Sequence, residues 1–217
     1  MCYNSCVIDI TKKHMFYNMG GLYMFLYWIG ICVSIIIAVV ILFLYLHLIE
    51  FMWCAFVKRQ PPFIGATEVH KNAVAKYINE HYPNAKNIVE CGSGHGGLAR
   101  YVARKTNTNV FGLENMPFCV FMSRFYSLFS CANFKTVKTD MFEYLDNTKN
   151  KFDVAIAFLG PVFTPLLQKY NKKIKVLISL DFEIPKLKPV EVIDLKRGYT
   201  IYNRKKYPHK LFIYEFK

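Results

Sequence analysis

The chain has 217 residues, a length that suits one folded domain or one domain with an appendage. Hydrophobic residues make up 53%, which is high for a soluble protein, and the formal net charge is +13. The seven cysteines form no CxxC pair and no paired Cys/His spacing, which argues against a disulfide framework and against a zinc site. The positive charge suits nucleic acid or anionic lipid headgroups, and by itself it does not choose between them.

The excess of hydrophobic residues lies near the N-terminus. From Leu22 to Leu46 the chain has no Asp, Glu, Lys, Arg or His, and this run exceeds the roughly 20 residues that cross a bilayer as a helix. His47 and Glu50 follow it and suit the polar edge of a bilayer, so we predict that the span ends near His47. The run is longer than the apolar region of a cleaved signal peptide, which favours a permanent anchor.

These features predict three regions: an N-terminal segment (1–21), a transmembrane anchor with an interfacial helix (22–57) and a folded domain (58–217). All Lys and Arg residues except Lys12 and Lys13 follow the anchor, and Lys58 and Arg59 stand close to its end. Positive charge at that end predicts a single-pass membrane protein whose domain faces the cytoplasm. A mitochondrial membrane, with the domain facing the matrix, is the alternative.

The folded domain follows a linker marked by Pro61 and Pro62. Thr67 is predicted to cap a helix that ends before Pro83. Beyond it, we predict strands at 87–91, 109–114, 134–140, 151–160, 172–180, 190–195 and 211–216, and helices at 96–105, 117–130 and 164–170.

The alternation of strands and helices predicts an α/β, Rossmann-like doubly wound sheet. The last two strands have no helix of normal length between them, which predicts an antiparallel C-terminal hairpin at the edge of this sheet. In the helix at 117–130, Asn115 is the predicted N-cap and Phe118, Phe121, Met122 and Phe125 share one face. Ligands of such sheets bind at the carboxyl ends of the strands.

The stretch "NIVECGSGHGG" (87–97) places a glycine loop after the first strand. Its G-x-G-x-x-G spacing alone is compatible with a dinucleotide site or a tight turn. Glu90 precedes the loop, and a carboxylate there would oppose a pyrophosphate but attract the cationic amino-acid end of S-adenosylmethionine. We therefore predict that this cofactor is bound by Glu90, Gly92, Ser93, Gly94 and Gly96.

Two further acids follow the next two strands. Glu114, 20 residues after Gly94, is placed to accept hydrogen bonds from ribose hydroxyls. Asp140 is placed to accept from the exocyclic amine of adenine, with Met141 or Phe142 against the base, and it can also cap the helix that follows. Asn115, next to Glu114, is included in the predicted cofactor site. His95, inside the loop, is either a residue at the edge of the site or a base.

In this order, the motifs resemble those of class I S-adenosylmethionine-dependent methyltransferases, from about residue 63 to residue 216. The anchor and the stretches "PPFIGAT", "VECGSGHGG", "GLENMPF", "FLGPVFTPLLQ" and "LISLDFEIPKLKPVEV" are similar to membrane-anchored protein-lysine methyltransferases, whose animal members modify the ATP synthase c-subunit and the adenine nucleotide carrier. The resemblance implies that Phe63, Ile64 and Thr67 belong to a lid over the active site. Gly65 and His95 depart from the family pattern, where proline and aspartate are usual.

The resemblance implies methyl transfer to a lysine of a membrane-proximal protein. The positive charge of an anchored chain makes anionic lipid headgroups a second expected partner, and no metal is expected. The chain has "FLGP" at 158–161 where methyltransferases of DNA bases and glutamine often carry N-P-P-Y or D-P-P-Y, so nucleic acid is not the expected partner. No catalytic base is assigned. Three alternatives stay open: a nucleotide-dependent reductase, an inactive cofactor-binding module, and a methyltransferase of a lipid or other small membrane acceptor.

Overall fold

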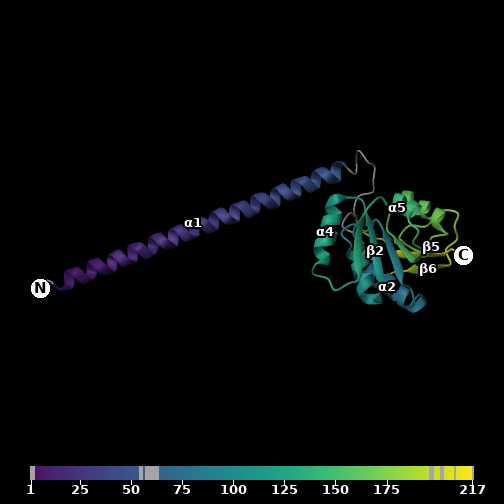
Figure 1. Cartoon of the computed structure of the whole chain (residues 1–217), viewed down its shortest axis with the longest axis horizontal. Helices are drawn as coiled ribbons and strands as arrows, with labels where there is room; N and C mark the ends of the chain where they lie inside the picture. The colour runs from purple at the N-terminus through teal and green to yellow at the C-terminus, as the bar shows by residue number, and fades with distance from the viewer. Residues whose placement is uncertain are drawn as a thin grey trace. The chain divides into compact units, whose positions relative to one another are not determined.

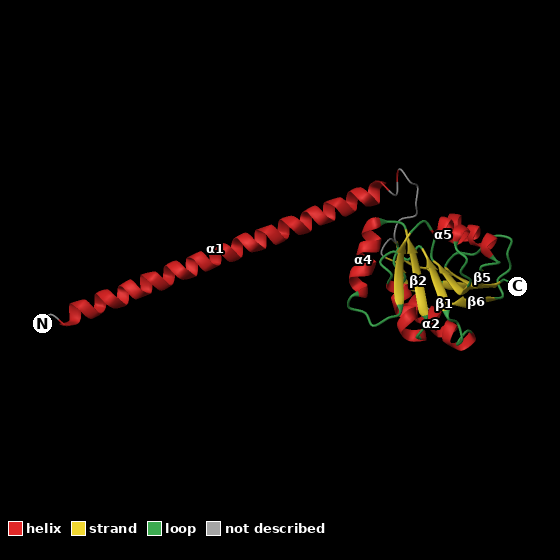
Figure 2. Cartoon of the chain, in the orientation of Figure 1, coloured by secondary structure: helices red, strands yellow, loops and turns green. Residues whose placement is uncertain are grey.

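The structure is a computed structural model that describes residues 3–53, 56, 64–195, 198–200, 203–207 and 209–216 (Figure 1). The chain divides into two compact units, the first ending at Met52 and the second beginning at Trp53. All the strands belong to the second unit (Figure 2). The predicted linker prolines and the predicted lid residue Phe63 lie outside the described residues.

The first unit is one helix, α1 (Tyr3–Met52). Its stretch Tyr23–Ile49 has 27 residues and a mean hydropathy of 3.1, and none of its most apolar window is buried. At ~1.5 Å per residue such a stretch is about 40 Å long, more than the ~30 Å of a bilayer's hydrocarbon core. Among the described helices, α1 is long and apolar enough to cross a membrane, as predicted for 22–46.

The second unit is built on a seven-stranded sheet with the order β3-β2-β1-β4-β5-β9-β6. Five strands run parallel and agree with the predicted ones to within a few residues: β1 (Asn87–Cys91), β2 (Asn109–Glu114), β3 (Phe134–Lys138), β4 (Phe152–Ala157) and β5 (Ile174–Leu180). The chain moves outward from β1 to β3 and then returns to β4 on the other side of β1. The order therefore reverses between β1 and β4, where ligands of such sheets bind.

The C-terminal edge of the sheet is antiparallel, as predicted. Strand β9 (Lys210–Glu215) pairs with β5, and β6 (Glu191–Asp194) pairs with β9. A separate two-stranded ribbon, β7 (Gly198–Thr200) with β8 (Asn203–Tyr207), stands between β6 and β9 in the sequence. It was not predicted, because this polar, lysine-rich segment lacks the apolar alternation that marks a half-buried strand.

Helices cover both faces of the sheet. Helices α2 (Glu68–His81) and α3 (Gly97–Thr106) pack on one face through Val74, Ile78 and Val102. Helix α5 (Met141–Asn147) and the 3-10 helix η2 (Thr164–Tyr170) pack on the other through Leu145 and Leu167. A short helix, α6 (Gly160–Phe163), precedes η2. Burial on both sides explains why the parallel strands are nearly continuous apolar runs.

Helix α4 (Pro117–Ser127) corrects one prediction. Its N-cap is Met116, not Asn115, and it carries no side-chain cap hydrogen bond. The carboxylate of Glu114 accepts the N–H groups of both Asn115 and Met116 at 2.8 Å, so the chain enters the helix held by the acid before it.

The aromatic face of α4 is turned outward. Phe121 is 54% exposed and Phe125 44% exposed, whereas Val120 and Ser123 are buried. Ser123 Oγ lies 2.7 Å from Thr136 Oγ1 in β3, a close approach that favours small side chains at the contact. We call the exposed surface the apolar face of α4; it consists of Phe121, Phe125, Tyr126, Leu128 and Phe129.

Candidate functional site

A cavity opens where the parallel strands end. Gly92 follows β1, Glu114 ends β2, Asp140 lies two residues past β3, and Phe158 follows β4, and all four line it. The remaining lining residues are Ile64, Leu113, Asn115, Met116, Thr139, Met141, Phe142, Leu159 and Phe163. The cavity therefore lies at the point where the strand order reverses, and its lining combines two acids with apolar side chains.

The glycine loop begins against β2. The N–H groups of Gly92 and Ser93 each donate to the carbonyl of Leu113 at 3.0 Å. Gly92 has a φ of +71°, and a Cβ at this position would lie 2.5 Å from Leu159 Cδ2. Any larger residue would strain the backbone and push a cavity-lining side chain aside, so glycine keeps this edge of the cavity open.

Ser93 and Gly96 support the loop from within. Ser93 is 4% exposed, and its hydroxyl has no hydrogen-bond partner among the described residues. Gly96 has a φ of +68° and precedes α3; a Cβ there would lie 2.4 Å from Ser123 Oγ and 2.7 Å from Phe134 Cζ. Gly96 thus lets the loop pack closely against α4 and β3.

Glu114 organises the site. One carboxylate oxygen, Oε2, accepts the N–H of Gly94 at 2.7 Å, and the other, Oε1, accepts those of Asn115 and Met116 at 2.8 Å. Three N–H donors hold the side chain in one position while it still lines the cavity. A carboxylate oxygen has two lone pairs, so Oε2 retains capacity for a ligand hydroxyl.

Asp140 caps α5, one of the two roles predicted for it. Its Oδ1 accepts the N–H groups of Phe142 at 2.8 Å and Glu143 at 3.1 Å. No residue that the structure describes donates a hydrogen bond to Oδ2, so this oxygen can accept one from a ligand. Met141 and Phe142 line the cavity beside it, as expected for the wall of a base pocket.

Glu90 lies within the fold and is not a lining residue. It is 5% exposed, and its Oε2 accepts the N–H of Ala99 in the first turn of α3 at 2.9 Å. Burial is the main cause that raises the pKa of Glu90 to about 8, while the Ala99 hydrogen bond opposes the shift. This acid is therefore largely protonated at neutral pH, and its predicted contact with a cationic ligand stays a prediction.

His95 belongs to the loop, and its side chain faces α4. Its ring packs edge-on against Phe118, with centroids 6.0 Å apart, and its carbonyl accepts from Arg100 Nη1 at 2.7 Å. The same guanidinium donates to the carbonyl of Ser123 at 3.2 Å, so Arg100 ties the loop to α4. These contacts favour a position at the edge of the site over the role of a base.

Of the predicted lid residues, the structure describes Ile64 and Thr67, and their surroundings differ. Ile64 lines the cavity and is 54% exposed. Thr67 caps α2 in a reciprocal arrangement with His70: its hydroxyl accepts the His70 N–H, and its own N–H faces His70 Nδ1, both at 3.4 Å. Thr67 therefore fixes where the segment enters the domain.

The structure thus brings together at the cavity Gly92, Glu114, Asn115, Asp140, Met141 and Ile64 of the predicted site residues. Glu90, Ser93, Gly94 and Gly96 support them from the loop and from β1. The apolar wall formed by Phe158, Leu159 and Phe163 was missed, because the fourth strand was predicted to run to residue 160 whereas β4 ends at Ala157. Its place at the carboxyl end of that strand was a usable signal.

Among known proteins, similarity to this chain is found in structure and not in sequence. No protein-family model matches the sequence, and no curated protein matches it. An RNA methyltransferase from Salinibacter ruber, solved with S-adenosyl-L-homocysteine, superposes with a TM-score of 0.55 at 15% identity, covering 70% of this chain and 94% of that one. An O-methyltransferase from Bacillus cereus, solved with SAH, gives a TM-score of 0.56 at 13% identity, covering 76% and 88%.

A third structure, M. capricolum TrmK with S-adenosyl-homocysteine, gives a TM-score of 0.53 at 15% identity, covering 71% of this chain and 70% of that one. Identities this low show the fold alone. The second unit therefore has the Rossmann-like fold of these methyltransferases, with a mixed seven-stranded sheet.

Proposed function

We propose that this protein is an S-adenosylmethionine-dependent methyltransferase held at a membrane by α1, and that it methylates a lysine of a membrane-proximal protein. One observation carries the enzyme class: a cavity at the strand-order reversal, with a fixed acid at the end of β2 and a second acid just after β3. Solved proteins of the same fold hold S-adenosylhomocysteine.

The residues present fit this cofactor. Glu114 Oε2 and Asp140 Oδ2 offer acceptor capacity for ribose hydroxyls and an adenine amine, and Met141 and Phe142 offer apolar surface for the base. Gly92 has no side chain, so a bound cofactor could approach the backbone closely at this position. A nucleotide-dependent reductase is less well supported, because the three solved structures of the same fold hold S-adenosylhomocysteine.

When bound, the cofactor supplies a methyl group from a sulfonium. The chain's own contribution is alignment and the exclusion of water, since positive charge moves from donor to acceptor and no oxyanion forms. Phe158, Leu159 and Phe163 form an apolar wall of the cavity, and Ile64 lines the same space. An apolar wall of this kind favours the neutral form of an amine acceptor, whose ordinary pKa is about 10.4.

The membrane part of the proposal is supported by the stretch Tyr23–Ile49 and by the basic residues Lys58 and Arg59 that follow it in the sequence. The choice of a lysine acceptor is supported by the sequence resemblance to anchored protein-lysine methyltransferases.

A binding experiment tests the cofactor. Full-length protein in detergent should bind S-adenosylmethionine, and Glu114→Ala together with Asp140→Ala should reduce the affinity by more than tenfold. Glu143→Gln is the matched control, because Glu143 is an exposed acid in the first turn of α5 and does not line the cavity. Failure of the wild type to bind, or stabilisation by nicotinamide dinucleotides in its place, would overturn the proposal.

A transfer experiment tests the acceptor. Membranes containing the protein are incubated with cofactor labelled in its methyl group, and protein is then separated from the lipid extract. Label on lysine of a membrane-proximal protein is the expected result. Label in the lipid extract would point to a lipid acceptor, and binding without any transfer would indicate an inactive module.

A further inference from the structure

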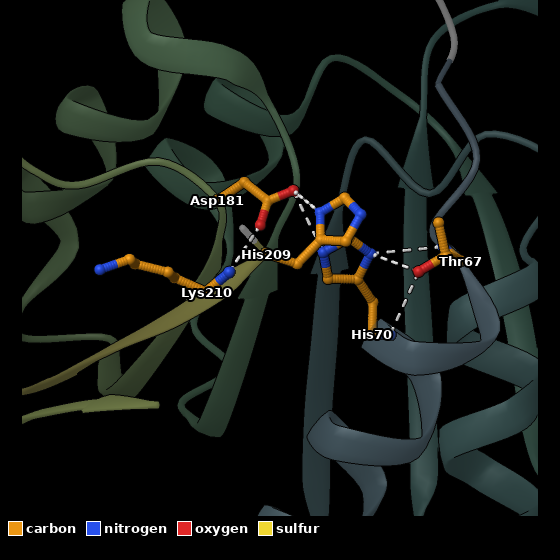
Figure 3. A network of polar contacts seen from close by, with 5 residues as sticks. All are labelled: Thr67, His70, Asp181, His209 and Lys210. Atoms are coloured by element: carbon orange, nitrogen blue, oxygen red, sulfur yellow. Dashed lines mark hydrogen bonds and ion pairs between the residues drawn. The ribbon is translucent and has the colours of Figure 1, made fainter. Parts of the chain in front are cut away.

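A second cluster of polar side chains lies outside the cavity described above (Figure 3). His70 comes from the first turn of α2, Asp181 follows β5, and His209 precedes β9. Both histidines are buried, at 0% and 3% exposed. Asp181 Oδ2 lies 3.1 Å from His70 Nε2 and 2.8 Å from His209 Nδ1, so two imidazole rings converge on one carboxylate oxygen.

The distances among these atoms suit a shared metal ion. One potential ligand atom from each residue lies within 4.8 Å of the others. Two ligands bound at ~2.0–2.2 Å to one tetrahedral ion are themselves about 3.3–3.6 Å apart, so the pairs found here at 2.8 and 3.1 Å would have to separate by a few tenths of an ångström around an ion. His70 Nε2 has no aligned hydrogen-bond partner among the described residues although it is close to Asp181. His209 Nδ1 is within hydrogen-bonding distance of the same oxygen, and an ion would replace the proton between these two atoms.

Further contacts hold two of the three ligands in place. The other ring nitrogen of His70, Nδ1, lies 2.9 Å from Thr67 Oγ1 and 3.4 Å from Thr67 N. Metal binding through Nε2 requires the tautomer with the proton on Nδ1, which then donates to Thr67 Oγ1 in place of accepting the Thr67 N–H. The other oxygen of Asp181, Oδ1, accepts the N–H of Lys210 at 2.8 Å. Figure 3 shows both supports flanking the cluster. Metal ligands are commonly oriented by such second hydrogen bonds.

From this geometry we propose that His70, Asp181 and His209 form a binding site for one divalent transition-metal ion of the Zn²⁺ type. Two imidazoles and one carboxylate are ligands that Zn²⁺ accepts, and three protein ligands leave a further position for water or substrate. The sequence predicted no metal, since the ligands are separated by 111 and 28 positions and form no motif.

The site adjoins the cavity through one aromatic side chain. The rings of His70 and Phe158 have centroids 5.4 Å apart, and Phe158 lines the cavity. A bound ion would therefore fix the entry segment at Thr67 and the ends of β5 and β9 relative to the wall of the cavity. The proposal itself does not depend on methyl transfer.

The test uses full-length protein in detergent, stripped of metal with a chelator. Zn²⁺ is titrated in competition with a chromophoric indicator, and Co²⁺ is titrated while visible absorption is recorded. One Zn²⁺ per chain and Co²⁺ bands typical of imidazole coordination are expected. Asp181→Asn and His209→Gln should each lower Zn²⁺ affinity at least 100-fold, and Thr67→Val should lower it 10–100-fold.

His81→Gln is the matched control, because His81 is an exposed histidine of the same helix that stacks on Tyr77. Its affinity should equal that of the wild type. Absence of Zn²⁺ and Co²⁺ binding by the wild type would overturn the proposal and leave a hydrogen-bonded cluster without metal. Unchanged binding in both Asp181→Asn and His209→Gln would overturn it as well. The Co²⁺ spectrum of the wild type shows whether the protein binds metal even where a variant fails to fold.

Discussion

Glu90 and Glu114 lie on neighbouring parallel strands, and their surroundings differ sharply. Glu90 is buried with one N–H donor, and burial raises its pKa to about 8. Glu114 is only partly buried and accepts three N–H groups. Two acids of one motif thus have different surroundings, because burial against α3 raises the pKa of Glu90 while Glu114 lines the cavity beside three donors.

The largest effect is expected from Glu90→Gln. The pKa of Glu90 is raised from 4.5 to about 8 in the folded protein. The stability of the wild type is therefore unaffected by this group below about pH 4.5 and decreases as pH rises from there through about 8, because the folded protein holds a proton that the unfolded chain has released. Glutamine can still accept from Ala99 and does not ionise. The variant should match the wild type in Tm near pH 4.5 and exceed it at pH 8, by on the order of a few kcal/mol in free energy of unfolding.

Thermal unfolding of both proteins across this pH range provides the measurement. Parallel pH dependences would mean that Glu90 is ionised in the folded protein and that the contrast with Glu114 is wrong.

A second experiment asks whether Glu90 meets a cationic ligand. If it does, cofactor binding at pH 7 should release a proton from this acid, because a nearby positive charge favours the carboxylate. Calorimetry in buffers with different ionisation enthalpies detects the proton. The release should vanish in Glu90→Gln; a release that persists in the variant would assign the proton to another group.

Glu114→Gln should cost about 1–3 kcal/mol of stability, because an amide NH₂ must then face at least one N–H that now meets a carboxylate oxygen. Cofactor affinity should fall with it. Denaturant unfolding and a binding titration measure the two effects. A fully stable variant would show that the loop does not depend on the three hydrogen bonds.

Asp140→Ala should cost about 1 kcal/mol through loss of the α5 cap. Asp140→Asn should restore most of this stability, since an amide oxygen can still accept from Phe142 and Glu143. Comparison of the two separates the cap from any ligand contact: equal cofactor affinity in the alanine variant and the wild type would rule out the adenine role.

The smallest effect is expected from Glu143→Gln, within about 0.5 kcal/mol, because its side chain is exposed. Denaturant unfolding next to Asp140→Ala provides the measurement. A larger loss would mean that acids at this end of α5 stabilise the helix by their charge alone. The hydrogen bonds of Asp140 would then not explain its effect.

Local patterns were sufficient for most of the fold. The strand, glycine loop and helix at 87–106 were predictable because apolar periodicity and glycine spacing are short-range signals. The sequence could not reveal that Glu90 is buried, since burial depends on packing from α3. Nor could it assemble His70, Asp181 and His209, which the topology brings together from distant positions.

In α4, too, packing decides what the sequence left open, namely the direction in which the predicted apolar stripe faces. Four aromatic or apolar side chains at helical spacing normally indicate the buried side of a helix. Here the contact with β3 is made through Ser123 and Thr136, and the larger side chains Phe121 and Phe125 are turned outward. Periodicity identified the apolar stripe but not the direction it faces.

The apolar face of α4 has a practical consequence for handling the protein. Leu128 and Phe129 are 78% and 77% exposed, and they extend a surface that belongs to the second unit and not to α1. Removing α1 would therefore leave an exposed hydrophobic patch on the second unit. A shortened chain should still need detergent to stay dispersed, and should brighten dyes that report exposed hydrophobic surface.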